Sequence, residues 1–544
     1  MKGIRFLAVP VLMFGLAMPM TVGAQDMSFG LEETGQSRAP VKLGKPSKRL
    51  AEAMGAFEAK KYETAAMGFE RVSAGKSNDG RGNRQRAQFL LGQSLYQMGY
   101  YQSALTVFDD ISAQGPAHID FGDTLEWLGL LASKLPESSG IIEKVGRYGI
   151  GALGQFKDKN PSLYNQLLYL MGRHLYAQAS FRQAIDVFQE VDVTSPQYSY
   201  AKFFEGISFI RMRKSRPAIA SFRAILDAID AGDIDGVDED RMRNLAWISL
   251  ARVYYTAANQ GKGGQIDGTL LGQSVESWTK IDQSSEYWLD SLFESSWAFF
   301  LADEYSRALG NVHTLYSPYF EQAFYPEALV LKAVTFFVNC QVDNAEATVA
   351  KFHDTYDPVK QELDSVLAKH QDNADFFEFL KKVRSDEADL SPRVRPIVST
   401  ALSDRTVLQH LEYVALLDKE EERLAKSGEA FAGSPVGGKI LEDVSLAKAF
   451  AVDQAGDLAR GRYKRLIREL RDLSNQVDTV ELEIATFRRG QIDQELQQQM
   501  SLAKQSKGGD VNVDEEHQLW PFNGEWWRDE LGFYRQQVTN LCTR

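Results

Sequence analysis

Residues 165–198 read NQLLYLMGRHLYAQASFRQAIDVFQEVDVTSPQY. Gly172 lies in a first apolar stripe, Ala184 and Phe188 lie in a second stripe, and Pro196 closes the segment. Apolar residues spaced three and four apart share one face of a helix. The segment therefore predicts two consecutive amphipathic helices joined by a short turn, with a small residue where the helices face each other.

The same pattern recurs along the chain. Residues 85–118 carry it at Gly92, Ala104 and Phe108, and a later copy follows at Gly206, Ala218 and Phe222, 34 residues after the copy quoted above. Weaker copies are marked by Tyr62, Ala65 and Phe69, by Ala251 and Tyr254, by Tyr305 and Ala308, and by Ala333 and Ala345. Roughly residues 46–360 resemble the tetratricopeptide repeat, which has a period of 34 residues and a helical hairpin as its unit.

The resemblance predicts an all-α solenoid over residues 46–400. Antiparallel helices approach closely only where one side chain is small, and we expect the phenylalanine four residues after the alanine to fill the gap toward the next hairpin. The family implies scaffolding, that is, binding of segments of other proteins without catalysis.

A different helical pattern follows in residues 401–505. Its most regular part is a stripe with alternating spacings of three and four, made of Tyr463, Leu466, Leu470, Leu473, Val477, Val480, Ile484 and Phe487. Such a heptad stripe is typical of a coiled-coil seam. Three interpretations fit it: an antiparallel helical hairpin, one helix that dimerises, or a helix lying on the solenoid. Residues 427–439, rich in glycine, predict a loop.

The chain begins with a positively charged start, an apolar run and small residues before Gln25, which predicts a secretory signal peptide over residues 1–24. A retained membrane anchor is the alternative. No later apolar run approaches the length needed to span a bilayer. We expect a protein secreted across the inner membrane into the periplasm, where it can also associate with the outer membrane. We expect residues 25–45 to be disordered because they lack apolar periodicity.

The formal net charge of −13 argues against nucleic acid or anionic lipid as a partner through bulk electrostatics. Carried over position by position, the resemblance implies a groove that binds a protein or peptide segment. Its residues would be Arg86, Phe89, Gln93, Tyr96, Gln166, Tyr169, Arg173, Tyr176, Tyr200 and Phe203. The alternative is that these aromatic side chains pack between repeats.

The C-terminal region, residues 506–544, combines a polar linker with an aromatic stretch. The aromatic residues are Trp520, Phe522, Trp526, Trp527, Phe533 and Tyr534. Trp526 and Phe533 are seven residues apart, as are Trp527 and Tyr534, so each pair can share a helix face. Because solenoids need their apolar ends covered, we expect a strap that docks back on the helices. A peptidoglycan or glycan platform and a partner-docking site are the alternatives.

The chain contains two cysteines, Cys340 and Cys542. Cys340 falls at the turn of the last clear repeat, where the tetratricopeptide family more often has glycine. In an exported chain the two can form a disulfide that locks the strap. Alternatively, Cys340 is a small buried residue and Cys542 is a free thiol.

Motifs that carry chemistry lack their required context. GIGALG at residues 149–154 fits a dinucleotide fingerprint but has no β-α-β unit around it. The two S-L-A-K sequences lie in helical surroundings, and the seven histidines show no metal-ligand spacing. The sequence therefore predicts no enzyme, no cofactor and no metal site.

A looser resemblance concerns the phrases YWLDSLFESSWAFFLADEYSRAL, FYPEALVLKAVTFFVNCQVDNA and WPFNGEWWRDELGFY. They are similar to parts of long exported tetratricopeptide proteins of deltaproteobacteria, some of which belong to envelope complexes for gliding motility. This resemblance implies a scaffold with other envelope proteins as partners. The alternative function is a peptidoglycan-binding module or an accessory to a cell-wall enzyme.

Overall fold

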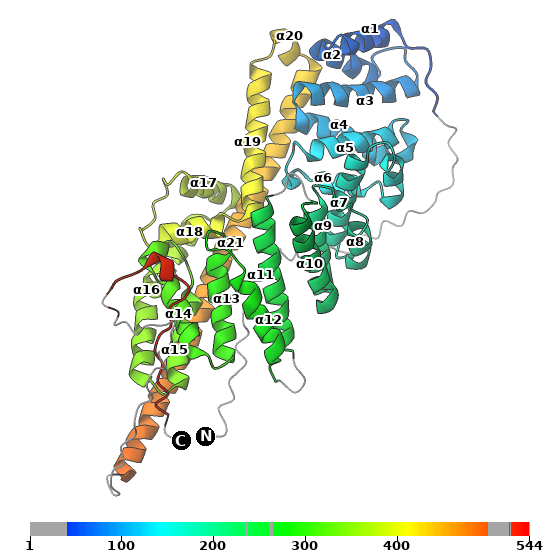
Figure 1. The fold of residues 1–544 in the computed structure, drawn as a ribbon. Coiled ribbons are helices and arrows are strands. Elements are labelled where there is room, and N and C mark those ends of the chain that lie inside the picture. The colour runs from blue at the N-terminus through cyan, green and yellow to red at the C-terminus, as the bar shows by residue number, and fades with distance from the viewer. Residues whose placement is uncertain (1–40, 234–237, 261–264, 499–521, 523, 543–544) are drawn as a thin grey trace. The chain divides into compact units, whose positions relative to one another are not determined.

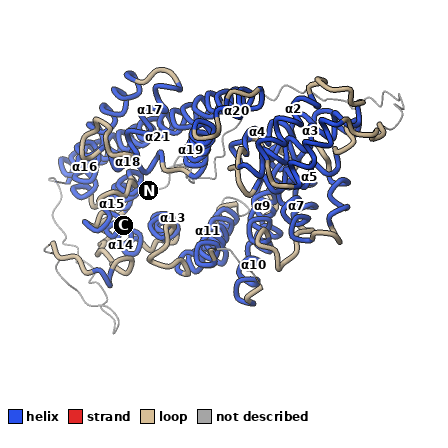
Figure 2. Tube along the Cα trace, turned by 90° about the horizontal axis from the view of Figure 1, so that it is seen from above, coloured by secondary structure: helices blue, strands red, loops and turns tan. Residues whose placement is uncertain are grey.

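The computed structural model describes residues 41–233, 238–260, 265–498, 522 and 524–542. Within these residues the secondary structure is helical and contains no strand, which confirms the predicted all-α class (Figures 1 and 2). None of the helices described here is long and apolar enough to cross a bilayer. The predicted signal peptide, residues 25–40 and the linker before the strap lie outside the described residues.

The first part of the chain consists of consecutive helices that pack mainly on their neighbours in sequence. The helices are α1 (Lys48–Glu58), α2 (Tyr62–Ser73), α3 (Arg81–Met98), α4 (Tyr101–Gln114), α5 (Phe121–Ala132), α6 (Ile141–Gly146), α7 (Pro161–Ala177), α8 (Phe181–Phe188), α9 (Tyr198–Arg211), α10 (Ser215–Ala231), α11 (Glu239–Ala258), α12 (Gly268–Thr279), α13 (Trp288–Leu301), α14 (Tyr305–Leu315), α15 (Pro326–Val338) and α16 (Val342–Lys369). Short 3₁₀ helices, including η2 (Glu137–Ser139) and η3 (Ile150–Phe156), interrupt the array around α6.

Three hairpins are closed by a phenylalanine ring that lies directly against a glycine. A Cβ atom at Gly172 would lie 2.4 Å from the ring of Phe188, and the same holds in the hairpins of Gly92 with Phe108 (2.7 Å) and Gly206 with Phe222 (2.6 Å). The ring also reaches the next hairpin, since Phe188 stacks on Phe204 at 6.2 Å. The predicted small position is thus confirmed, and the ring fills space within its own hairpin as well as toward the next one.

The turns inside the hairpins share one backbone conformation. A residue with positive φ lies between the two helices in each of six hairpins, and these residues are Lys60, Gly99, Ala179, Arg213, Asp303 and Cys340. A left-handed residue reverses the chain within a few residues, and glycine adopts this conformation most easily. The common turn and the glycine–phenylalanine contact together make this a tetratricopeptide-like helical repeat.

The second part contains α17 (Asn373–Arg384), α18 (Val394–Leu402), α19 (Arg405–Ala425), the short α20 (Glu429–Ala432) and α21 (Pro435–Gln498). Helices α19 and α21 form an antiparallel hairpin (Figure 1). The predicted loop over residues 427–439 is therefore too long. Helix α21 begins at Pro435, because proline is well suited to the first helical turn, where its missing N–H has no partner to lose.

The heptad stripe of α21 is covered by helices of the same chain. Tyr463 is fully buried and packs on Phe376 and Phe379 of α17, and Phe337 of α15 contacts Phe487. Helices α15, α16, α17 and α18 all contact α21. The N-terminal part of α21 thus forms a hairpin with α19, and its stripe lies on the last repeats, so a second copy of the chain is not needed to cover it.

Residues 41–45 differ from the expected disorder. The backbone N–H of Gly44 donates to Asn83 Oδ1 at 3.2 Å, and Asn83 Nδ2 donates to the carbonyl of Lys45 at 3.2 Å. Gly82 allows this approach, because a Cβ there would lie 2.4 Å from the carbonyl oxygen of Lys42. Residues 41–45 make these contacts through their backbone. Such contacts require no apolar periodicity, so the sequence pattern does not predict them.

The glycine–phenylalanine contact predicts opposite effects for one substitution at two sites. Gly172→Ala should lower the free energy of unfolding by about 1–2 kcal/mol, because the overpacking cost exceeds the helix propensity that alanine gains. Gly55→Ala should raise it by about 0.5–1 kcal/mol, since no atom lies within 4 Å of its Cβ position on exposed α1. Thermal and urea melts measure both, and stabilisation by Gly172→Ala would contradict the packing argument.

Candidate protein-binding surfaces

The aromatic side chains of the predicted groove pack mainly between repeats. Phe89 and Phe203 are 4% and 8% exposed, so they belong to the core and not to an open groove. Tyr169 contacts Tyr200 and Phe204 of the next hairpin at 6.3 and 6.4 Å. The remaining aromatic residues are Tyr96, which contacts Tyr101 and Trp127, and Tyr176, which contacts Phe181 and Phe204.

The polar residues of the predicted groove have partners within the chain. Arg173 forms two hydrogen bonds with the carboxylate of Glu137, at 2.6 and 2.7 Å, and its guanidinium lies 4.0 Å from the ring centre of Phe204. Gln166 donates to the carbonyl of Gly129 at 3.0 Å, whereas Gln93 is half-buried. Arg173 therefore joins η2 to α7 and α9, which makes it a structural residue.

Arg86 is engaged in the same way. It pairs with the fully buried carboxylate of Asp120 at 2.9 Å. Burial raises the pKa of Asp120 to about 6, although the positive charge of Arg86 acts in the opposite direction. Removing either partner would leave a buried polar group unpaired, so the pair holds α3 against the start of α5.

A cleft of about 870 Å³ lies where the first two hairpins meet α19. Its lining residues are Lys60, Lys61, Tyr62, Glu63, Thr64, Met98, Tyr100, Lys419, Glu422, Arg423, Lys426 and Ser427. Five of them are cationic and two are acidic, in a chain whose net charge is −13. The cleft is therefore a local positive site on an acidic protein.

Two of the cationic side chains in this cleft interact with other groups of the same chain. Lys426 pairs with Glu422 at 3.2 Å, and Arg423 donates to the carbonyl of Gly99. For the exposed Lys60, Lys61 and Lys419, the described part of the chain offers no ion pair. The cleft also contains the first turn of α2, whose N-cap Lys61 makes no side-chain capping bond, so that backbone N–H groups there lack acceptors within the helix.

A buried carboxylate of α19 holds one wall of the cleft in place. Glu420 accepts a hydrogen bond from the backbone N–H of Gln102 at 2.9 Å, at the start of α4, while its other oxygen is buried without a hydrogen-bond partner. Tyr413 donates to the side chain of the same Gln102. Burial raises the pKa of Glu420 to about 7, against the effects of the Gln102 N–H and the Arg423 guanidinium.

The C-terminal strap runs along α14 as extended chain. The N–H of Gly532 donates to Thr314 Oγ1 at 3.0 Å, and the N–H of Gln536 donates to the carbonyl of Ser306 at 3.1 Å. Gly310 makes this possible, because a Cβ there would overlap the carbonyl of Tyr534. The strap then reaches the α15–α16 turn, where the N–H of Leu541 donates to the carbonyl of Asn339 at 2.9 Å.

The rings of the strap gather around one histidine. Trp526 stacks on His313 of α14 at 4.2 Å, and Phe522 and Tyr534 meet the same ring edge-on at 4.8 and 5.3 Å. Burial, together with the charges of Lys332 and Lys351, lowers the pKa of His313 to about 4. The imidazole is thus neutral at pH 7, as a stacked aromatic ring.

The predicted helix-like pairing of these rings is wrong. The described part of the strap is extended apart from a bend at Gly524, the 3₁₀ turn η6 (Arg528–Glu530) and the turn that follows at residues 531–533, so a spacing of seven does not put two rings on one face. Trp526 and Tyr534 are docked together, whereas Trp527 and Phe533 are 43% and 74% exposed. Trp520 lies outside the described residues.

Cys340 and Cys542 form a disulfide across 202 residues of sequence, with their Cα atoms 5.1 Å apart. The bond joins the end of the strap to the left-handed turn between α15 and α16. Both ends of the strap are therefore held, one by rings around His313 and the other by a covalent bond.

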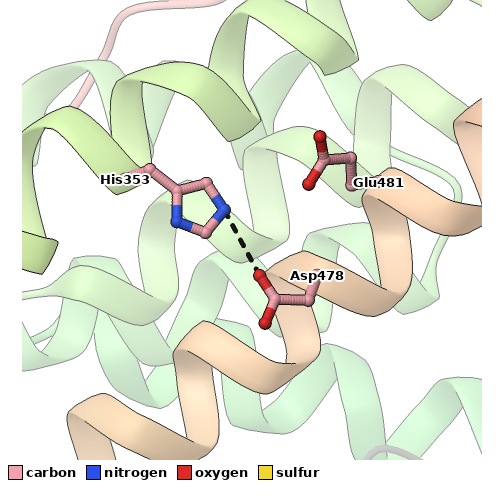
Figure 3. A group of neighbouring side chains, drawn as sticks. All are labelled: His353, Asp478 and Glu481. Atoms are coloured by element: carbon pink, nitrogen blue, oxygen red, sulfur yellow. Dashed lines mark ion pairs between the residues drawn. The ribbon is translucent and has the colours of Figure 1, made fainter.

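One group of side chains in the described residues can hold a metal ion: His353, Asp478 and Glu481 (Figure 3). Spacing in the sequence could not reveal it, because the histidine lies on α16 and the carboxylates lie on α21. The lysines of the cleft were not predicted from the sequence for the same reason, because Lys419 is distant from the others in the chain. The adjacent pair Lys60 and Lys61 before α2 is the one sequence signal that could have indicated a positive site.

No protein-family model matches this chain, and no curated protein matches it in sequence. Among solved structures, the apo form of RapI aligns with 65% of this chain and 97% of its own length, at 14% identity and a TM-score of 0.32. The tetratricopeptide domain of P58(IPK) aligns with 74% of this chain and 97% of its own, at 13% identity and a TM-score of 0.18. Since both scores are low, the character of the repeats is established by the hairpin packing itself.

The docked and exposed rings of the strap should respond differently to truncation. Trp526→Ala should speed amide exchange of Gly532 and Gln536 by about tenfold, the equivalent of about 1.4 kcal/mol, because the half-buried ring helps hold the strap on α14. Phe533→Ala is the control and should leave this exchange unchanged. Exchange measured by mass spectrometry or NMR tests both variants.

The opposite pattern would change the interpretation of the strap. Unchanged exchange in Trp526→Ala, combined with lost sedimentation on purified sacculi, would show that these rings are a glycan platform.

The raised pKa of Glu420 predicts a pH-dependent stability difference. The unfolded carboxyl titrates near 4.5 and the folded one near 7, so its protonation stabilises the fold fully below about pH 4.5, and this stabilisation is lost as the pH rises through 7. Glu420→Gln removes this titration. The free energy of unfolding of the variant should therefore rise relative to that of the wild type by about 1.4 kcal/mol per pH unit between about pH 4.5 and 7.

Urea midpoints of both proteins between pH 5 and pH 8 measure this difference. Glu422→Gln, an exposed neighbour on α19, is the control and should show no such trend. A flat difference for Glu420→Gln would mean that the carboxylate is ionised throughout.

Proposed function

We propose that this protein is a non-catalytic scaffold of the periplasm that assembles an envelope complex by binding an acidic segment of a partner protein. The observation that carries the proposal is the positive cleft between the first two hairpins and α19. The tetratricopeptide-like fold supports protein binding in general, since stacked helical hairpins present extended surfaces to other chains.

The chemistry of the cleft favours an acidic peptide. Lys60, Lys61 and Lys419 supply charges without partners among the described residues, and the N-terminus of α2 adds N–H donors that favour negative groups. Elsewhere the acidic chain repels an acidic partner, so attraction is concentrated at this site. The volume of about 870 Å³ accommodates several side chains of an extended segment.

The cellular setting of the proposal comes from the sequence. The predicted signal peptide supports export, and the disulfide is of a kind that persists in oxidising compartments. The looser resemblance to exported gliding-motility proteins suggests a motility complex as the assembly. N-terminal sequencing of the mature protein from a periplasmic fraction tests the localisation, and a start at Met1 in a cytoplasmic fraction would refute it.

The binding proposal predicts a site-specific loss of affinity. Changing Lys60, Lys61 and Lys419 to glutamate should weaken binding of a labelled poly-glutamate peptide by at least about tenfold at low salt, because a like charge replaces an attractive one in the cleft. Fluorescence anisotropy measures the affinity, and a poly-glutamine peptide of the same length should bind neither protein.

The matched control changes Lys134, Lys157 and Lys159, which are exposed lysines outside the cleft, to glutamate. It alters the net charge equally and should leave the affinity nearly unchanged. If both variants lost the same affinity for poly-glutamate, the effect would come from the net charge of the protein and the proposed site would be refuted. Binding of sacculi in place of the peptide would favour the alternative function, a peptidoglycan-binding module. The observation that supports this alternative is the exposure of the Trp527 and Phe533 rings.

A further inference from the structure

A second feature lies outside the cleft, where α16 meets the distal half of α21. His353 projects from α16 toward Asp478 and Glu481, which lie three residues apart on α21 (Figure 3). One nitrogen or oxygen atom from each side chain lies within 4.8 Å of the others. Three side chains from two helices thus converge on one point.

The imidazole of His353 is oriented by a fourth residue. Its Nδ1 lies 3.1 Å from Asp357 Oδ2, one turn further along α16. An ionised carboxylate only accepts hydrogen bonds, so Nδ1 carries the proton and donates it. In the neutral ring, Nε2 then presents its lone pair to the carboxylates of α21.

In this arrangement the lone pair of His353 Nε2 faces negatively charged carboxylate oxygens. The atom is buried and has no hydrogen-bond partner, and Asp478 Oδ1 lies 3.4 Å from it. A lone pair facing two carboxylates is unfavourable unless a positive charge lies between them. Lys360 does not supply it, because its ammonium group contacts Asp357 and Ser474.

We propose that His353, Asp478 and Glu481 bind a divalent transition-metal ion, with Zn²⁺ as the physiological class of ligand. An imidazole nitrogen with two carboxylate oxygens is a donor set that zinc accepts, and three protein ligands leave one position for water. Asp357 acts as the outer carboxylate that commonly fixes a metal-binding histidine in the correct tautomer. The bound ion would join α16 to α21.

Such an ion would reinforce a part of α21 that is held by apolar contacts and by ion pairs to α16, such as that of Arg488 with Asp343. The seam residues Val477, Val480 and Ile484 are buried next to the proposed site. An ion that binds only the folded chain stabilises the fold, and this stabilisation grows with the logarithm of the ratio of free ion concentration to Kd. The proposal concerns the contact between α16 and α21 and does not depend on the cleft.

The test is zinc binding by the untagged full chain after treatment with a chelator, by calorimetry at pH 7.5. A single Zn²⁺ ion should bind to the wild type. His353→Gln and a combined Asp478→Asn, Glu481→Gln variant should lose at least about tenfold in affinity, and Asp357→Asn should lose about tenfold as an outer-shell change. The chain has no free thiol to compete for zinc, since both cysteines are bonded.

His370→Gln is the matched control. His370 makes a similar contact, 2.9 Å from Asp375 Oδ2, but its ring stacks on Phe379 and, among the described residues, belongs to no group of three ligands. This variant should bind zinc like the wild type. Co²⁺ absorption spectra should report the imidazole and carboxylate ligands, with the visible bands lost in His353→Gln.

Several outcomes would overturn the proposal. Zinc affinity unchanged in His353→Gln, or lost equally in His370→Gln, would show adventitious surface binding. Absence of binding by a wild-type chain with a normal thermal melt would refute the site and leave the cluster as a contact between α16 and α21. Melts of the metal-free variants exclude misfolding as the cause of any loss.

Discussion

Helix α21 holds the early repeats and the later helices together, because it supplies one wall to each of two hydrophobic cores. Its first part contributes Val436, Ile440, Val444, Ala451 and Ala455 to the core of the early repeats. Its second part contributes Tyr463, Leu466, Leu470 and the rest of the heptad stripe to the core of α14–α18. Most of the stability of a helix in a folded protein comes from packing of its apolar face and not from intrinsic helix propensity, so burial along its length holds α21 in place.

The transition between the two cores occurs at Gly456. A Cβ atom there would lie 1.8 Å from the carbonyl oxygen of Asn373, so only glycine allows α17 to begin this close to α21. The same principle operates in the hairpins, where Gly172 and Gly206 admit phenylalanine rings. Close contacts at glycine thus set both the spacing within the repeats and the position at which α21 passes from one core to the other.

The contacts made by α19, α21 and the strap explain where free binding surface is left. Arg86 and Arg173 form ion pairs with other helices of the array, and the aromatic residues around them pack between repeats. These side chains therefore do not form an open binding groove. Helix α19 docks on the first hairpins through Glu420 and creates the cleft there. The strap covers α14, and its disulfide secures its end at the α15–α16 turn. The surfaces proposed for a partner and for a metal ion lie at junctions between distant segments.

The helical hairpins and the buried face of α21 can be predicted from the amino-acid sequence alone. Hairpin contacts join residues fewer than 34 positions apart, so a repeated pattern such as Gly172, Ala184 and Phe188 records them directly. A heptad stripe likewise records which face of a helix is apolar. It does not record which surface covers that face, because any apolar surface, including a second copy, satisfies the same spacing. Other contacts follow from the tertiary fold alone: α15–α18 cover this face, Trp526 and Tyr534 meet at His313, Lys419 lines the same cleft as Lys60, and His353 faces Asp478. These contacts depend on the path of the chain over tens to hundreds of residues, and the extended strap is held by backbone hydrogen bonds, which leave no periodic signal in the side chains.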